Sequence, residues 1–226
     1  MDPRRRHHEH REIPRPRDMP PPREGDGAAA PALRRIFDWP FRAILAMVVA
    51  TGLSPMQLTV LGLLSNVLLG WLLLRGEAFA AGMLLVLAGL FDLLDGAVAR
   101  IRGTASRLGA FADAALDRVS DMILFGCTFW MLSAQGHRLG AALALATLVI
   151  SLGVSHIRAD AEAAGVALSE GLFQRLERYV AMFFALVVPG MMLPMLLLLT
   201  ALGGLTVAQR AWNALTRVGA APREGA

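Results

Sequence analysis

Residues 92–117 of this chain read DLLDGAVARIRGTASRLGAFADAALD, and this stretch decides how the rest of the sequence is interpreted. It lies in sequence that is otherwise apolar enough to span a membrane, yet it contains the four aspartates Asp92, Asp95, Asp113 and Asp117. An aspartate at the centre of a spanning helix costs roughly 2.5–3.5 kcal/mol on insertion scales, so four uncompensated ones would cost on the order of 10 kcal/mol. We therefore expect the four carboxylates to bind something cationic.

The composition predicts a polytopic membrane protein. Of the 226 residues 55% are hydrophobic, and the mean hydropathy is +0.52, which is too apolar for an ordinary soluble domain. The net charge of +4 and the pI near 10.7 would suggest a nucleic-acid partner in a soluble protein. In a membrane protein the basic residues are explained by topology and anionic lipids, so no nucleic-acid partner is expected. The single Cys127 allows no intramolecular disulfide and is read as a small core residue.

The sequence divides into three regions. Residues 1–32 combine Arg, Pro, His, Glu and Gly with few large apolar residues, which predicts a disordered cytosolic arm and not a cleavable signal. Residues 33–212 form the expected membrane domain, and 213–226 form a cytosolic tail. The membrane domain opens with an amphipathic helix at 33–51 that suits a position along the membrane interface.

Six apolar stretches follow, each near the roughly 20 residues that a bilayer requires. They are residues 55–74, 79–100, 106–133, 139–157, 172–188 and 191–212. The expected fold is therefore an all-α integral membrane protein with six transmembrane helices preceded by an interfacial amphipathic helix.

The arginines predict the orientation. Those of the amino-terminal arm, the turn at 100–107, the connection at 158–178 and the tail fall on one side, whereas Arg75 and Arg138 fall on the other. The positive-inside rule places the first group in the cytosol. We expect a multi-pass protein of the cytoplasmic (inner) membrane, with both termini and the aspartate cluster facing the cytosol.

Helical geometry places the polar residues of the opening stretch on two faces. At 100° per residue, positions 92, 95, 96, 99 and 100 fall within an arc of about 140°, and positions 109, 113 and 117 within about 80°. A short turn around Gly103 predicts that the two helices are antiparallel neighbours. The four carboxylates should then converge near the cytosolic surface.

Converging carboxylates suit a hard divalent cation such as Mg²⁺ or Mn²⁺, and four are enough for two ions. Paired ions can clamp a diphosphate and neutralise the charge that develops on a leaving phosphate. Gly96 and Ala99 leave room on the same face for a ligand, and Arg100 supplies a fixed cation for a phosphate. Phosphoryl-group chemistry is the interpretation that this set favours.

Three alternatives remain open on the residues alone. Small residues such as Gly96, Ala99 and Gly109 are common wherever membrane helices pack closely. Intramembrane carboxylates also serve as ion or proton relays in transporters. A Mg²⁺-dependent prenyltransferase would hold a diphosphate in a similar way, although a further acidic residue would be expected where Ala99 stands.

The spacing D-x2-D-G-x2-A-R-x8-G-x3-D-x3-D resembles the signature of the CDP-alcohol phosphotransferase family at every fixed position. Ser54, Pro55 and Thr59 resemble the family's entry to its first spanning helix, and Ser106 and Arg118 sit as expected around the second half of the motif. The resemblance covers most of 33–212. It implies transfer of a phosphatidyl group from CDP-diacylglycerol to the hydroxyl of a small alcohol, with release of CMP, and it suggests a homodimer.

The resemblance also implies roles for single residues. The metal pair is assigned to Asp92, Asp95, Asp113 and Asp117, and Asp117 is also the candidate base for the attacking hydroxyl. Contacts with the CDP portion are assigned to Thr59, Gly96, Arg100, Ser106 and Gly109. Asp121 continues the series on the same helix; we read it as a structural residue bonded to a neighbouring hydroxyl, in preference to a partner of Arg118 or Arg100.

The connection before the fifth expected span bears on the acceptor. Arg158, Arg175 and Arg178 are candidates for binding a phosphate carried by the acceptor. The segment is similar to family members that use phosphorylated polyols, but Asp160 stands where those enzymes usually have a basic residue. Inositol phosphate and glycerol 3-phosphate are therefore both expected as candidate acceptors.

Overall fold

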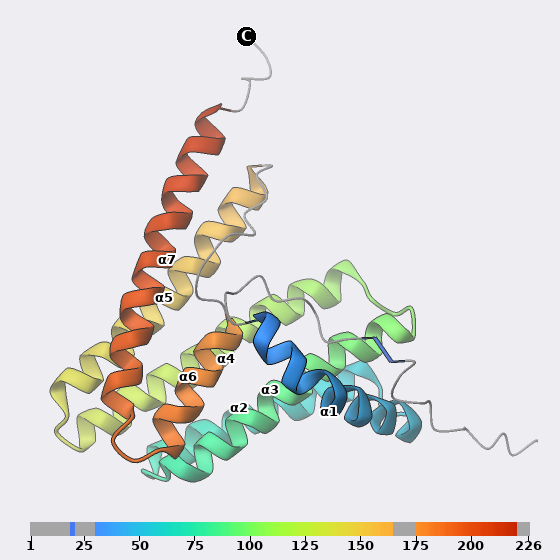
Figure 1. Cartoon of the computed structure of the whole chain (residues 1–226), viewed down its shortest axis with the longest axis horizontal. Coiled ribbons are helices and arrows are strands. Elements are labelled where there is room, and N and C mark those ends of the chain that lie inside the picture. Colours follow the sequence, from blue (N-terminus) through green and yellow to red (C-terminus); the bar gives the residue numbers. More distant parts are fainter. Residues whose placement is uncertain (1–18, 21–29, 165–174, 221–226) are drawn as a thin grey trace, which may run out of the picture.

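The computed structural model describes residues 19–20, 30–164 and 175–220, and within them the chain folds into seven α-helices and no strand. The helices are α1 (Ala30–Thr51), α2 (Pro55–Leu74), α3 (Ala78–Ile101), α4 (Arg107–Ala134), α5 (Arg138–Ala163), α6 (Arg175–Val187) and α7 (Met192–Ala220). Figure 1 shows α5 and α7 running side by side, with their C-terminal parts extending beyond the other helices. The all-α prediction is confirmed for the described residues.

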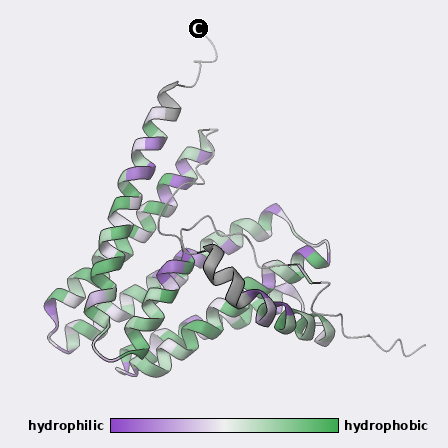
Figure 2. Cartoon of the chain, in the orientation of Figure 1, coloured by the Kyte–Doolittle hydropathy of each residue, from purple (hydrophilic) through white to green (hydrophobic). Residues whose placement is uncertain are grey.

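Four of the helices are long and apolar enough to cross a membrane: α2, α3, α5 and residues 192–216 of α7. The other two expected spans, which correspond to α4 and α6, are not both long and apolar enough to meet this criterion. The last 18 residues of α4 still contain Asp117, Arg118 and Asp121, and the described part of α6 has only 13 residues. The expected start of that span at Leu172 lies outside the described residues. Figure 2 shows hydrophobic residues along most of the helices and hydrophilic ones gathered near helix ends and turns.

The outer surfaces of the helices are apolar. Large hydrophobic side chains such as Leu64, Trp71, Trp130 and Val149 are half or more exposed. A water-facing surface rarely carries so many contiguous apolar side chains, whereas a lipid-facing one requires them. The surface therefore agrees with the predicted membrane protein.

Three glycines let pairs of helices approach closely. A Cβ atom added at Gly70 would lie 2.7 Å from Ile123 Cγ2 of α4, and one added at Gly82 would lie 2.7 Å from Val187 Cγ2 of α6. The same distance separates an added Cβ at Gly203 on α7 from Cγ2 of Ile150 on α5. Membrane helices gain van der Waals contact when small residues allow such approaches. These glycines are packing residues, and none of them belongs to the aspartate motif.

The two motif helices bring their carboxylates together, as expected, but they do not pack closely along their length. Helix α3 packs against α2 and α6, and α4 packs against α2 and α5, while α3 and α4 make almost no direct contact with each other. Their facing sides carry carboxylates, which repel one another and leave nothing apolar to bury. Helix α2 therefore bridges them, and the aspartates face each other across the space between.

Two helices continue past the apolar stretches that predicted them. Helix α5 runs to Ala163 and not to residue 157, because Arg158 and Glu162 form an ion pair one turn apart at 2.8 Å and support the polar end of the helix. Helix α7 continues to Ala220, beyond the expected end at Trp212. By contrast, α2 has the predicted limits because Ser54 accepts a hydrogen bond from the Gln57 amide and closes a capping box.

Candidate metal centre

A turn at residues 102–106 separates the two halves of the motif, which lie on α3 and α4. Gly103 adopts a left-handed conformation with φ of 64°, which lets the chain reverse without strain. The Ser106 hydroxyl then accepts a hydrogen bond from the Gly109 amide at 3.0 Å and caps the start of α4. Both Ser106 and Gly109 are exposed. The motif therefore builds its own turn and its own helix start.

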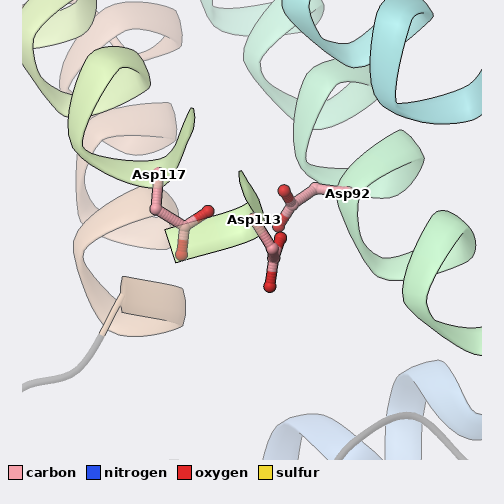
Figure 3. Close-up of side chains that lie close together, drawn as sticks. All are labelled: Asp92, Asp113 and Asp117. Atoms are coloured by element: carbon pink, nitrogen blue, oxygen red, sulfur yellow. The ribbon is translucent and has the colours of Figure 1, made fainter. Parts of the chain in front are cut away.

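Three of the four aspartates form a compact cluster. One carboxylate oxygen from each of Asp92, Asp113 and Asp117 lies within 4.8 Å of the other two, and all three residues are half-buried. Figure 3 shows Asp92 pointing from α3 toward Asp113 and Asp117 on α4. An all-carboxylate group of this size fits a hard divalent cation such as Mg²⁺ or Mn²⁺.

The fourth aspartate, Asp95, has a separate partner. The Thr59 hydroxyl on α2 donates its one proton to Asp95 Oδ2 at 2.6 Å, with the Pro55 carbonyl at 3.0 Å as the alternative acceptor. The carboxylate is buried, and it lines a small cavity together with Asp92 and Asp113. Thr59, which the family resemblance assigned to the CDP portion, thus holds the orientation of one of the expected metal ligands.

The cavity beside the carboxylates is lined by a polar residue that was not among the expected site residues. It has a volume of about 20 Å³, enough for one water molecule. Asn66 on α2 lines it, donates through Nδ2 to the Gly62 carbonyl at 3.0 Å, and has a buried Oδ1 without a hydrogen-bond partner in the described structure. The signal was an asparagine in the middle of an apolar helix, where an amide is retained only if something pairs with it.

Arg175 lies against the carboxylate cluster. Its Nη1 donates to Asp92 Oδ2 at 2.8 Å and also to Asp117 Oδ1. Its Nη2 donates to the Tyr179 hydroxyl at 3.2 Å, and the guanidinium stands 5.0 Å from the centre of the Tyr179 ring. Arg175 was expected to bind an acceptor phosphate. Tyr179 was not among the expected site residues, although it is the chain's one tyrosine and stands one helical turn after that arginine.

Arg178 is held in a buried network that joins three helices. Its Nη2 donates to Asp121 Oδ2 on α4 at 2.9 Å, and the Ser151 hydroxyl on α5 donates to the same oxygen. All three residues are buried. The structural interpretation of Asp121 is confirmed, and its arginine partner is neither Arg118 nor Arg100.

The remaining residues assigned to substrate fall in two places. Gly96 is not a packing glycine, because an added Cβ would meet only Nη1 of Arg100 on the same helix, at 3.6 Å, among the described residues. Gly109 likewise would meet only its own cap, Ser106 Oγ, at 3.3 Å. Both positions therefore leave space that a ligand can occupy. Arg158 is exposed near the C-terminal end of α5, where it pairs with Glu162, and it does not contact the carboxylate cluster.

These features define a class of site: a carboxylate cluster of the kind that holds divalent cations, set among apolar helices, with an arginine against it and glycines that leave open space. The sequence profile of CDP-alcohol phosphatidyltransferases matches residues 53–219. The chain belongs to the CDP-alcohol phosphatidyltransferase family. This confirms the family resemblance drawn from the aspartate spacing.

Curated relatives in this family include enzymes that make inositol phospholipids. A phosphatidylinositol phosphate synthase from Mycobacterium marinum is 39% identical over 132 residues, a match that covers 57% of this chain and 56% of that protein. A second from Corynebacterium glutamicum is 33% identical over 154 residues, covering 67% and 70%. An archaetidylinositol phosphate synthase from Pyrococcus horikoshii is 35% identical over 148 residues, covering 65% and 76%.

Solved structures share the fold. The phosphatidylinositol phosphate synthase of Mycobacterium tuberculosis with CDP-DAG bound has a TM-score of 0.70 and 31% sequence identity, covering 80% of this chain and 94% of that one. The same enzyme in complex with manganese and citrate has a TM-score of 0.69, with 80% and 90% covered.

Proposed function

We propose that this protein transfers the phosphatidyl group of CDP-diacylglycerol to inositol phosphate and releases CMP. The observation that carries the proposal is the convergence of three carboxylates beside the open face of Gly96 and Arg100. Such a site binds divalent cations and a diphosphate together. Family membership and the phosphatidylinositol phosphate synthases among its relatives support the donor and the acceptor.

The proposed membrane arrangement has six spanning helices, α2 to α7, with α1 lying along the interface. Helices α4 and α6 are included because their charged residues lie at one end, while apolar positions such as Leu124 and Met182 belong to the same buried core as the four long apolar helices. The arginine distribution supports an orientation in the cytoplasmic (inner) membrane with that charged end and both termini on the cytosolic side. Residues 1–32 and 213–226 flank this membrane domain, and the protein acts as a homodimer.

The proposed cofactor is a pair of Mg²⁺ or Mn²⁺ ions held by Asp92, Asp113, Asp117 and Asp95. When bound, these cations neutralise the diphosphate of the donor and the charge on the departing CMP. Manganese is present in one solved structure of a relative, which supports the choice of cation. On the protein side, Thr59 keeps Asp95 turned toward the cavity.

The donor is proposed to lie along the glycine face of α3. Gly96 and Gly109 admit it close to the backbone, and Arg100 and Ser106 supply hydrogen-bond donors for its CDP portion. Its acyl chains then extend beside the apolar helices into the lipid.

The chemical step exchanges one phosphorus–oxygen bond for another. The acceptor hydroxyl oxygen bonds to the phosphorus that carries diacylglycerol, and the bond from that phosphorus to CMP breaks. Asp117 is proposed to take the hydroxyl proton, because its carboxylate pairs with Arg175 beside the proposed acceptor phosphate. Arg175, which reaches the same carboxylate, is the proposed ligand of the acceptor phosphate.

The other two acceptor candidates take different roles. Arg178 is proposed to act indirectly. Its buried network holds α6 in place and so positions Arg175, which lies one helical turn before it. Arg158 stays a prediction, because in the structure it pairs with Glu162 on the surface of α5.

The acceptor is tested by CMP release. Purified protein in detergent with Mn²⁺ and CDP-diacylglycerol receives inositol phosphate, glycerol 3-phosphate, free inositol or serine in separate reactions. We expect release with inositol phosphate, because a phosphate is needed to engage Arg175, and little with free inositol or serine. Preference for glycerol 3-phosphate would retain the chemistry and change the acceptor.

Three other outcomes would contradict the proposed acceptor or the proposed reaction. Release with serine alone would show that Arg175 does not select for a phosphate. Consumption of an isoprenyl diphosphate, with no alcohol giving CMP, would make the protein a prenyltransferase. Ion flux through liposomes without any CMP release would make it a transporter.

A further inference from the structure

Arg175 pairs with two of the three carboxylates that would hold a divalent cation. Its Nη1 pairs with Asp92 Oδ2 and Asp117 Oδ1, two of the three members of the carboxylate cluster. Arg175 lies on α6, more than fifty residues from either aspartate in the sequence. The cluster thus carries its own positive charge, supplied by a different helix from those that bear the aspartates.

The Arg175 guanidinium and a divalent cation would compete for the Asp92 and Asp117 carboxylates. A cation on Asp92 and Asp117 would stand close to Nη1, and like charges so near each other repel even at a half-buried site. We therefore propose that Arg175 is an internal counter-ion: it pairs with Asp92 and Asp117 while the cluster is free of metal, and a divalent cation displaces it from them.

Tyr179 gives the displaced arginine a second anchor. Its hydroxyl accepts from Nη2 at 3.2 Å, and its ring lies under the guanidinium at 5.0 Å. Neither contact involves a carboxylate, so both persist when the ion pairs break. The ring packs directly against α3, since a Cβ added at Gly89 would make ordinary contact with Tyr179 Cδ2 at 3.4 Å. Tyr179 is thus a positioning residue that keeps Arg175 beside the cluster instead of in open solvent.

The displacement couples metal binding to acceptor binding. This consequence rests on the proposed function, in which Arg175 takes the acceptor phosphate. Metal binding releases the guanidinium for that phosphate, and a bound phosphate in turn keeps the guanidinium away from the carboxylates. Because such coupling is reciprocal, each ligand raises the affinity of the other.

The counter-ion role is tested by Mn²⁺ affinity alone. Full-length protein in detergent, without nucleotide or acceptor, is titrated with Mn²⁺ while free Mn²⁺ is followed by electron paramagnetic resonance. We expect Arg175→Gln to bind Mn²⁺ about tenfold more tightly than the wild type, the factor that follows if the ion-paired state is about 90% populated. Arg138→Gln removes the same charge from an exposed position at the start of α5 and should match the wild type. Unchanged or weaker binding by Arg175→Gln, or an equal gain in Arg138→Gln, overturns the proposal.

A second measurement uses the unaltered protein. An arginine-selective dicarbonyl reagent is applied with and without Mn²⁺, and peptide masses report the rate at each arginine. The Arg175 rate should rise when Mn²⁺ is bound, while the Arg138 rate stays constant. A constant or falling Arg175 rate contradicts displacement, whatever the variants do.

Adding inositol phosphate separates this proposal from the proposed function. The acceptor should tighten Mn²⁺ binding in the wild type and leave Arg175→Gln unaffected. Tighter binding by Arg175→Gln with no acceptor effect in the wild type would support the counter-ion role and remove Arg175 from the acceptor site.

Discussion

Asp113→Asn abolishes CMP release and weakens Mn²⁺ binding by more than about a hundredfold, since even residues that only support a metal ligand change affinity by about 10–100-fold. Asp113 belongs to the three-carboxylate cluster, and asparagine keeps its size while removing the charge that a divalent cation needs. The protein should still fold, because relieving repulsion among crowded carboxylates does not destabilise it. Thermal unfolding in detergent without metal should therefore begin no lower than in the wild type. Asp92→Asn should behave in the same way toward metal and CMP.

Asp160→Asn is the matched control for these variants. Its side chain is 67% exposed and pairs only with His156 on the same helix among the described residues, so the same substitution removes a charge outside the cluster. We expect wild-type Mn²⁺ affinity from this variant. Full CMP release by Asp113→Asn, in protein that contains no wild-type contaminant, would rule out the carboxylate cluster as the metal centre.

Arg178→Gln is expected to lower the free energy of unfolding by about 3–5 kcal/mol, the usual cost of removing one partner from a buried ion pair. The substitution leaves the Asp121 carboxylate buried with only the Ser151 hydroxyl as a donor in the described structure. Because the network joins α4, α5 and α6, its loss also loosens the helix that carries Arg175. Unfolding in detergent, followed by circular dichroism against temperature, measures the effect.

A double variant separates the charge from the packing. Adding Asp121→Asn to Arg178→Gln removes the stranded charge and should restore most of the lost stability. Arg158→Gln breaks an exposed pair of the same type, with both side chains 53% exposed, and should cost less than about 1 kcal/mol. Equal stability of Arg178→Gln and the wild type would mean that the buried network does not hold α6.

The sequence predicted the parts of this structure that depend on neighbours in the chain. Ser54 and Pro55 mark the start of α2 because capping is a local interaction. Asp92 and Asp113 meet because helical periodicity puts each on the polar face of its helix and a five-residue turn joins the two helices. Hydropathy found the helices but misplaced the C-terminal ends of α5 and α7, because it reports contact with lipid and not hydrogen bonding of the backbone. The polar end of α5, around Arg158, was missed for that reason.

The contacts of α6 could not be predicted from local patterns. Arg175 pairs with Asp92 across 83 residues, and nothing in either segment states that α6 packs against α3. A helical wheel gives the face of one helix but not the identity of its neighbour. For the same reason Arg175 and Arg178 looked alike in the sequence, whereas one reaches the carboxylate cluster and the other is buried against Asp121.

The most direct measurement is metal-dependent CMP formation by the purified wild-type protein with CDP-diacylglycerol and inositol phosphate. The metal is removed with a chelator, the chelator is dialysed away, and Mn²⁺ is returned in increasing amounts. CMP formation should stop on removal and return in parallel with Mn²⁺ bound at the Asp92–Asp113–Asp117 cluster. CMP formation that continues at full rate in metal-free protein would contradict the metal centre and the transfer chemistry built on it.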